Sequence, residues 1–325
     1  MKGLTDIPGI KIGHASDFDG LTGCTVILCE AGAVAGAEIR GSASGTQEFD
    51  VMNPLHVTPY VHGVVFAGGS AFGLEAASGV RRFLERKGAG YETGAAKVPL
   101  VPCAILYDLG IGKATARPTR EMGEAAAAAA NDGPVREGSI GAGTGATVGK
   151  LAGLKQAMKG GVGSFTVALG GASGSVLVSS LAVVNALGDV LDWQTGKILA
   201  GARRSSDSQE FIDTAQEIKR GARIGFKKGN TTLVVVATNA RLTKVEALKV
   251  AQFAHQGMIR AISPVHTTAD GDLVIALSLG EEKADVNAIG IAAAESVAQS
   301  IGRGVLNAVS LGGIPGLMKM KRSSE

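Results

Sequence analysis

The strongest constraint on how this chain folds is an alternation of strand and helix patterns in its last third. Residues 231–238 are apolar and rich in β-branched side chains, which predicts a buried strand. Thr243, followed three residues later by glutamate, forms a capping-box pattern that opens a predicted helix over residues 243–260. A second strand is predicted over residues 273–278, and a second helix over residues 284–301. This alternation predicts a mixed α/β body.

The rest of the chain consists of short apolar runs separated by glycines. Glycine accounts for 48 of the 325 residues, about twice its usual share, which indicates tight turns and close backbone approach. Strands are predicted over residues 24–29, 61–67 and 98–106, and helices over residues 70–87 and 121–131. No linker separates two parts of the chain, so residues 1–325 are predicted to form a single domain.

One uncharged stretch is long enough to cross a bilayer. No charged residue lies between Lys159 and Asp189. Residues 170–174 are rich in glycine, however, and both flanking halves are rich in Val, Ser and Thr, which favours two strands joined by a turn. The polar residues 203–222 are predicted to be an exposed connector. With no apolar segment of signal-peptide length at the N-terminus, a cytoplasmic protein without a membrane partner is expected.

Composition argues against several functional classes. Hydrophobic residues make up 45% of the chain and charged residues 19%, with a net charge of +3 from interspersed acids and bases, so no nucleic-acid footprint is visible. Neither the three cysteines nor the five histidines show metal-ligand spacing, and we expect no metal and no cofactor. His266 is interpreted as a loop histidine bonded to backbone. Residues 141–146 lack the spacing of a dinucleotide loop, and Lys150 is not followed by the Ser or Thr of a P-loop.

A small polar pair, Asn230-Thr231, stands at the mouth of the first strand of the last third. A threonine in this place can become a nucleophile if the peptide bond before it is cut, because its freed α-amine then serves as the general base. The same two residues also suit a turn that simply opens a strand. The choice between these interpretations depends on other parts of the chain.

Two further segments could support such chemistry. Gly143, Thr144 and Gly145 lie in a glycine-dense loop whose N–H groups could bind an oxyanion, although a purely structural turn has the same composition. Asp270 and Asp272 flank one glycine immediately before a buried strand. They either shape a turn or bind the amine or hydroxyl of a nucleophile.

Taken together, five segments resemble the self-processing P1 (S58) peptidase family, which includes the L-aminopeptidase/D-esterase DmpA, β-peptidyl aminopeptidases and a nylon-oligomer hydrolase. The segments are residues 68–74, 141–146, 159–164, 183–188 and 230–231. The resemblance implies an αββα sandwich of the DmpA and ornithine acetyltransferase type, similar to N-terminal-nucleophile hydrolases. It also implies self-cleavage between Asn230 and Thr231 into an α chain (1–230) and a β chain (231–325).

The resemblance also assigns roles to single residues. It makes Thr231 the nucleophile and likens Asn185 to the asparagine that helps to hold the oxyanion in this family. Asp270 and Asp272 resemble the Asp-x-Asp pair of the nylon-oligomer branch, whereas the aminopeptidase branch has a Ser nucleophile and a Ser-x-Glu pair.

The nylon-oligomer branch also implies a catalytic lysine, and we choose Lys159 over Lys150 for that role. The implied substrate is a small peptide, amide or ester with a free amine, which Asp270 and Asp272 could pair with. The implied assembly is a homo-oligomer, a tetramer of αβ units.

Two other functions remain open from the sequence. Residues 237–240 read Ala-Thr-Asn-Ala, which is similar to the Ala-Thr-Asp-Ala of ornithine acetyltransferases, so an acyltransferase is one alternative. A non-catalytic binding protein with the same fold is the other.

Overall fold

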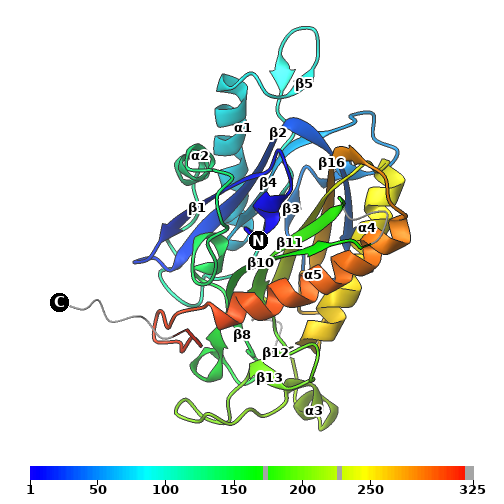
Figure 1. Ribbon diagram of the computed structural model, residues 1–325. Coiled ribbons are helices and arrows are strands. Elements are labelled where there is room, and N and C mark those ends of the chain that lie inside the picture. The colour runs from blue at the N-terminus through cyan, green and yellow to red at the C-terminus, as the bar shows by residue number, and fades with distance from the viewer. Residues whose placement is uncertain (171–174, 225–228, 319–325) are drawn as a thin grey trace, which may run out of the picture.

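The strand predicted at residue 231 lies at the centre of a large sheet. β14 (Thr231–Ala240) pairs in antiparallel fashion with β11 (Leu177–Asn185) and in parallel with β16 (Leu273–Glu282). The helices α4 (Lys244–Ala261) and α5 (Val286–Leu306) cover one face of these strands (Figure 1). All four elements predicted in the last third are therefore confirmed, and Thr243 caps α4 through a capping box with its glutamate partner.

The structure is a computed structural model that describes residues 1–170, 175–224 and 229–318. Its main sheet has the strand order β10-β11-β14-β16-β2-β4-β7-β3, and β1 pairs with β2. The remaining strands of this sheet are β1 (Lys11–Asp17), β2 (Thr22–Ile39), β3 (Thr46–Gln47), β4 (Val61–Ala67), β7 (Cys103–Ile105) and β10 (Gly161–Ala168).

Smaller elements complete the chain. The short strands are β5 (Tyr91–Glu92), β6 (Lys97–Val98), β8 (Thr147–Val148), β9 (Met158–Lys159), β12 (Asp189–Leu191), β13 (Ile198–Ala200) and β15 (Ile262–Ser263). The other α-helices are α1 (Ala76–Arg86), α2 (Arg120–Ala128) and α3 (Thr214–Lys219). The 3-10 turns are η1 (Leu4–Asp6), η2 (Phe49–Met52), η3 (Ser70–Glu75), η4 (Gly141–Gly143) and η5 (Leu154–Gln156).

The long strand β2 turns the sheet into two layers. Its first half pairs with β1 and β4, and its second half pairs with β16, with a shift of register between Leu28 and Ala33. Such an irregularity bends a strand and increases its twist. The two halves of the sheet therefore face each other, with α1 and α2 outside one half and α4 and α5 outside the other (Figure 1). The result is the αββα sandwich expected from the sequence.

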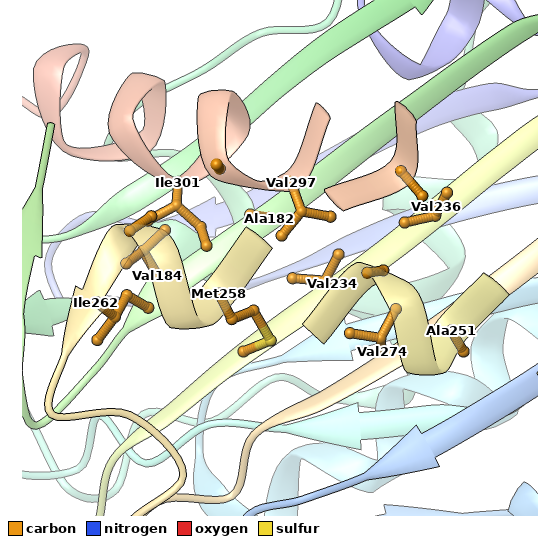
Figure 2. Close-up of a cluster of buried hydrophobic side chains, with 14 of the residues drawn as sticks. Ala182, Val184, Val234, Val236, Ala251, Met258, Ile262, Val274, Val297 and Ile301 are labelled. Atoms are coloured by element: carbon orange, nitrogen blue, oxygen red, sulfur yellow. The ribbon is translucent and has the colours of Figure 1, made fainter. Parts of the chain in front are cut away.

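Side-chain alternation along β14 builds two cores at once. Val234 and Val236 face α4 and α5, whereas Leu233 and Val235 face the space between the two sheet layers. Figure 2 shows Val234 beside Met258 of α4 in the first of these cores. Both faces of the strand are buried, and a slip of one residue would turn every side chain of β14 into the other core. The register of residue 231 is therefore strongly fixed.

The uncharged stretch forms two antiparallel strands, as predicted. Every residue of β10 pairs with a residue of β11. The predicted turn at 170–174 lies, apart from its first residue, outside the described residues. None of the helices in the described ranges combines the length and the apolar character that crossing a membrane requires.

Two sequence expectations are wrong in detail. The predicted strand 98–106 is divided between β6 and β7, because Pro99 and Pro102 cannot donate hydrogen bonds within a ladder. The segment 203–222 contains α3, and it is anchored: the buried carboxylate of Asp189 accepts hydrogen bonds from the backbone nitrogen and hydroxyl of Thr214, at 2.7 and 2.8 Å. A buried carboxylate needs such donors, and sequence does not show where they come from.

The close packing of α4 on β2 gives a stability prediction. A Cβ atom added at Gly36 of β2 would lie 2.2 Å from the backbone nitrogen of Leu248, so Gly36→Ala must push the helix away from the sheet. We expect a loss of about 1–3 kcal/mol in the free energy of unfolding, measured by denaturant titration. Gly170→Ala is the control, because its Cβ would meet no atom of the described residues within 4 Å. Equal stabilities of the two variants would contradict the packing described.

Candidate active site

The side chains singled out around residue 231 meet where β11 ends and where β14 and β16 begin. Asn185 is the last residue of β11 and lies opposite Thr231 in the ladder. Asn230 forms a bridge with Asp270, and Asp272 directly precedes β16. These five residues are between 0 and 3% exposed. The three strands therefore bring them together in one buried cluster.

Two donors converge on the carbonyl oxygen of Asn230. The hydroxyl of Thr231 forms a short hydrogen bond to it, and the backbone nitrogen of Gly271 donates to it at 2.8 Å. A Cβ at Gly271 would lie 2.9 Å from the Thr231 Oγ1 atom and 2.7 Å from the carbonyl oxygen of Ala43, so the backbone can approach this closely only at a glycine. The hydroxyl and the peptide bond before it are thus held in contact.

The two aspartates accept hydrogen bonds from different parts of the cluster. Asp272 Oδ1 accepts a hydrogen bond from the backbone nitrogen of Thr232 at 2.7 Å. Asp270 accepts from the backbone nitrogen of Leu187 at 3.2 Å and from the hydroxyl of Thr267 at 2.5 Å. Burial, and secondarily the charge of Asp272, raise the pKa of Asp270 above its ordinary value.

Among the lysines that the structure describes, Lys150 contacts this cluster. Its Nζ atom donates to the backbone oxygen of Asn185 at 2.8 Å, to the side-chain oxygen of Asn185 at 2.9 Å and to the carbonyl of Gly229 at 3.3 Å. Burial lowers the pKa of Lys150 from its ordinary 10.5 to about 7, although the charge of Asp270 opposes this shift. The side-chain nitrogen of Asn185 donates to the carbonyl of Tyr107 at 3.3 Å.

Lys159, which was preferred from the sequence, instead binds the glycine loop. Its Nζ atom donates to the carbonyls of Thr144 and Ala146, at 2.8 and 2.6 Å. The backbone nitrogens of Gly143 and Thr144 donate to carbonyls three residues earlier, at 2.8 and 3.1 Å, so both amides are already used. Gly145 lines the cavity described next. The donor on the Asn230 carbonyl comes from Gly271, which sequence reasoning did not single out.

A cavity of about 300 Å³ opens beside the cluster. Tyr107, Ile111 and Leu154 contribute apolar side chains to its walls, and Lys150 and Gly229 also line it. Gly229 immediately precedes the Asn230–Thr231 pair, and Lys150 binds Asn185, so two lining residues of the cavity contact or adjoin the cluster. A largely apolar pocket with a few polar groups is typical of a site for a small molecule.

Two histidines also belong to the cluster, and the sequence gave no sign of this. The ring of His266 was expected to bind backbone, but it binds a side chain. Its Nδ1 atom lies 3.0 Å from Asp272 Oδ2, and the backbone nitrogen of His266 donates to the same oxygen. His255 of α4 lies on the other side of the His266 ring. Within the described residues, no group of three or more His, Cys, Asp and Glu side chains is placed to hold a metal ion.

Comparison with known proteins gives consistent matches along the chain. Residues 2–318 match the model of a family described as peptidase family S58. The chain is 36% identical to an uncharacterized aminopeptidase of Mycobacterium bovis, with 97% of this chain and 96% of the relative covered. It is 31% identical to a 6-aminohexanoate-oligomer endohydrolase of an Agromyces species, with 95% and 81% covered.

Solved structures share the fold at lower identity. The L-aminopeptidase D-Ala-esterase/amidase of Ochrobactrum anthropi, titled a new variant among the Ntn hydrolase fold, superposes with a TM-score of 0.70 at 18% identity, covering 97% of this chain and 88% of its own. A β-aminopeptidase of a Burkholderia species gives 0.68 at 21% identity, covering 98% and 91%. At this identity, the likeness establishes the αββα fold of the Ntn-hydrolase type.

The burial of Lys150 predicts a pH dependence of stability. Above pH 7 the unfolded chain binds more protons at this lysine than the folded chain does, because burial lowers the folded pKa to about 7. The free energy of unfolding should therefore rise from pH 7 to pH 9 by at most about 1.4 kcal/mol per pH unit from this group. Lys150→Met should lose this part of the rise in denaturant titrations, and Lys155→Met, at an exposed lysine, should keep it. Equal slopes for all three proteins would contradict the burial of a neutral amine.

Proposed function

The chain belongs to peptidase family S58, and we propose that it is a self-processing amide hydrolase whose nucleophile is Thr231. One observation carries the proposal: the Thr231 hydroxyl contacts the carbonyl of its own preceding peptide bond, and Gly271 donates to the same oxygen. A buried hydroxyl placed on a peptide carbonyl that already has a hydrogen-bond donor is prepared for attack on that carbonyl.

The self-cleavage step would follow from this contact. The Thr231 hydroxyl oxygen attacks the carbonyl carbon of Asn230, the C–N bond breaks, and the α-amine of Thr231 takes up a proton as it leaves. Water then opens the resulting ester, which releases the Asn230 carboxylate and restores the hydroxyl. The products are an α chain (residues 1–230) and a β chain (residues 231–325). The Gly271 amide would stabilise the oxyanion, a contribution typically worth about 3 kcal/mol.

The mature enzyme would use the same hydroxyl on substrate. The new α-amine of Thr231, with an ordinary pKa of about 7.7–8.0, accepts the hydroxyl proton as the hydroxyl attacks an amide or ester carbonyl. The substrate C–N or C–O bond then breaks, and the protonated α-amine gives the proton to the leaving amine or alcohol. Asn185, positioned by Lys150, lies beside the nucleophile, where it can bind the oxyanion. Water completes hydrolysis of the acyl-enzyme. The cavity beside Lys150 accepts a small substrate, and the carboxylates of Asp270 and Asp272 favour one that carries an amine.

The names of the relatives support an amide substrate. One relative is called an aminopeptidase and another a 6-aminohexanoate-oligomer endohydrolase, and both names describe cleavage of amide bonds. The Asp-x-Asp pair and the threonine occur together in this chain. We therefore propose small amine-bearing peptides or amides as substrates, and a reaction more similar to that of the 6-aminohexanoate-oligomer endohydrolase than to that of the aminopeptidase.

The first prediction is self-cleavage. Denaturing mass spectrometry of the purified protein should find two fragments, the smaller beginning Thr-Thr-Leu-Val. Thr231→Ala should leave the chain intact and abolish hydrolysis of aminoacyl p-nitroanilides, because the nucleophile is lost. A single stable chain with full activity would exclude the proposed mechanism.

Thr232→Val provides a matched control for this prediction. The Thr232 hydroxyl is fully buried and has no hydrogen-bond partner among the residues that the structure describes. Its replacement by an isosteric methyl group keeps the backbone nitrogen that Asp272 binds. We therefore expect self-cleavage and turnover close to those of the wild type. Loss of both in Thr232→Val would indicate that Thr232, and not Thr231, is the nucleophile.

A second prediction concerns the aspartates. Asp270→Asn and Asp272→Asn keep the shape of the side chain but remove its negative charge, and charge-assisted hydrogen bonds are about twice as strong as neutral ones. Each variant should fold and lose at least roughly tenfold in kcat, about 1.4 kcal/mol of barrier. Wild-type rates from both folded variants would contradict this role and would show that the two aspartates only shape a turn.

A further inference from the structure

The ring of His266 lies between the carboxylate of Asp272 and the ring of His255. Its Nδ1 atom is 3.0 Å from Asp272 Oδ2, and its Nε2 atom is 3.3 Å from Nδ1 of His255. The other nitrogen of His255, Nε2, lies 3.1 Å from the carbonyl oxygen of Glu38 on β2. The side chains thus form one row from the backbone of β2 to the carboxylate that binds the nitrogen of Thr232.

The direction of each hydrogen bond in this row follows from the groups at its two ends. A backbone carbonyl only accepts, so His255 Nε2 carries a proton toward Glu38. Neutral His255 then has a bare Nδ1, which accepts from His266, so His266 Nε2 must carry a proton. The carboxylate of Asp272 also accepts, which places a second proton on His266 Nδ1. By this accounting His266 carries protons on both ring nitrogens.

The alternative distribution would put the positive charge on His255. His255 is fully buried, whereas the His266 side chain is 14% exposed. Burial lowers the pKa of His255 to about 4, and although its bond to the Glu38 carbonyl opposes this, nearby His266 and Arg40 lower it further. Asp272 favours charge on His266 because its carboxylate lies 3.0 Å from His266 Nδ1 and accepts two backbone N–H groups beside it.

We infer that His266 is held as an imidazolium that balances the charge of Asp272 and thereby sets the basicity of the amine that activates the nucleophile. His266 is a positioning residue, since it acts through Asp272. The protonation of His266 follows from the hydrogen-bond geometry and from the burial of His255, and its catalytic consequence rests on the function proposed above. The backbone of His266 is held in the left-handed region, at φ 55°, a conformation that few non-glycine residues adopt, although histidine adopts it more often than most.

The catalytic consequence comes from the charges around the new N-terminus. Two neighbouring carboxylates would hold the α-amine of Thr231 as an ammonium, which cannot accept the hydroxyl proton. An imidazolium on Asp272 cancels one of these charges. Among the residues that the structure describes, the other titratable groups near the row are Asp270, Glu38, Arg40 and Lys150. Arg40 lies 3.7 Å from the carboxylate of Glu38, so these two largely balance each other.

Nitrogen-15 NMR of the histidine rings tests the protonation directly and needs no activity. At about pH 7.5, roughly one unit above the ordinary histidine pKa of about 6.5, a solvated ring is mostly neutral and has one protonated and one bare nitrogen. We expect one ring of the wild-type protein to show two protonated nitrogens, and His266→Gln to remove that signal. A neutral His266 ring would overturn the inference, whether or not the chain cleaves itself.

The pH profile of kcat/KM tests the catalytic consequence. His266→Gln removes the positive charge and leaves Asp272 unbalanced, so the acid limb should move to higher pH by about half a unit to one unit. His56→Gln, at a partly exposed histidine on the loop after η2, should leave the profile unchanged. A uniform fall in rate without a shift of the acid limb would reduce His266 to a structural role.

A pair of variants at His255 gives a second route if His266→Gln does not fold. Gln can accept from His266 and donate to the Glu38 carbonyl, whereas Met has a similar length but offers no comparable acceptor. His255→Gln should therefore keep the doubly protonated ring of His266 and the wild-type acid limb. His255→Met should weaken the signal and move the limb in the direction predicted for His266→Gln. Identical spectra and profiles for the two variants would contradict the row of hydrogen bonds.

Discussion

The site depends on the binding of β14 by the loop that precedes β16. Gly271 donates to the carbonyl of Asn230, and Asp272 accepts from the nitrogen of Thr232, so this loop holds both sides of Thr231. Backbone groups at the mouth of a central strand have no ladder partner beyond its end, and leaving them buried and unpaired would be costly. The aspartates and the glycine supply these partners, and in doing so they fix the peptide bond against the hydroxyl.

The same arrangement concentrates charge in a buried place. Asp270, Asp272, Lys150 and Lys159 are all at most 3% exposed, and burying charge is unfavourable unless it is paired and hydrogen-bonded. Here both lysines bind carbonyls, and burial lowers their pKa values to about 7. Groups whose pKa values lie far from the ordinary are common at catalytic sites, since acid–base chemistry near neutral pH needs them. The two valine-rich cores on either face of β14 offset the cost of this cluster.

Sequence patterns were sufficient wherever local chemistry decides the structure. The β-branched run of β14, the Thr243 capping box and the uncharged hairpin were predicted because strand propensity, capping and alternation act over a few residues. The predicted strand across Pro99 and Pro102 was wrong because hydrophobicity was weighed without the missing N–H groups. The αββα sandwich itself came from resemblance, since no local pattern shows that β2 passes from one sheet layer to the other.

For the site, the sequence by itself determined the polar residues at the ends of strands: Asn185, Thr231 and the Asp-Gly-Asp segment. Only the tertiary structure decided their partners. It placed Lys150 rather than Lys159 against Asn185, assigned the donor on the Asn230 carbonyl to Gly271, and set His266 beside Asp272. The physical reason is that most of these hydrogen bonds join groups far apart in the sequence, 35 residues for Lys150 and Asn185 and 40 for Thr232 and Asp272, so they depend on how strands and loops meet in space. The spacing of residues in the sequence does not show which strands and loops come together.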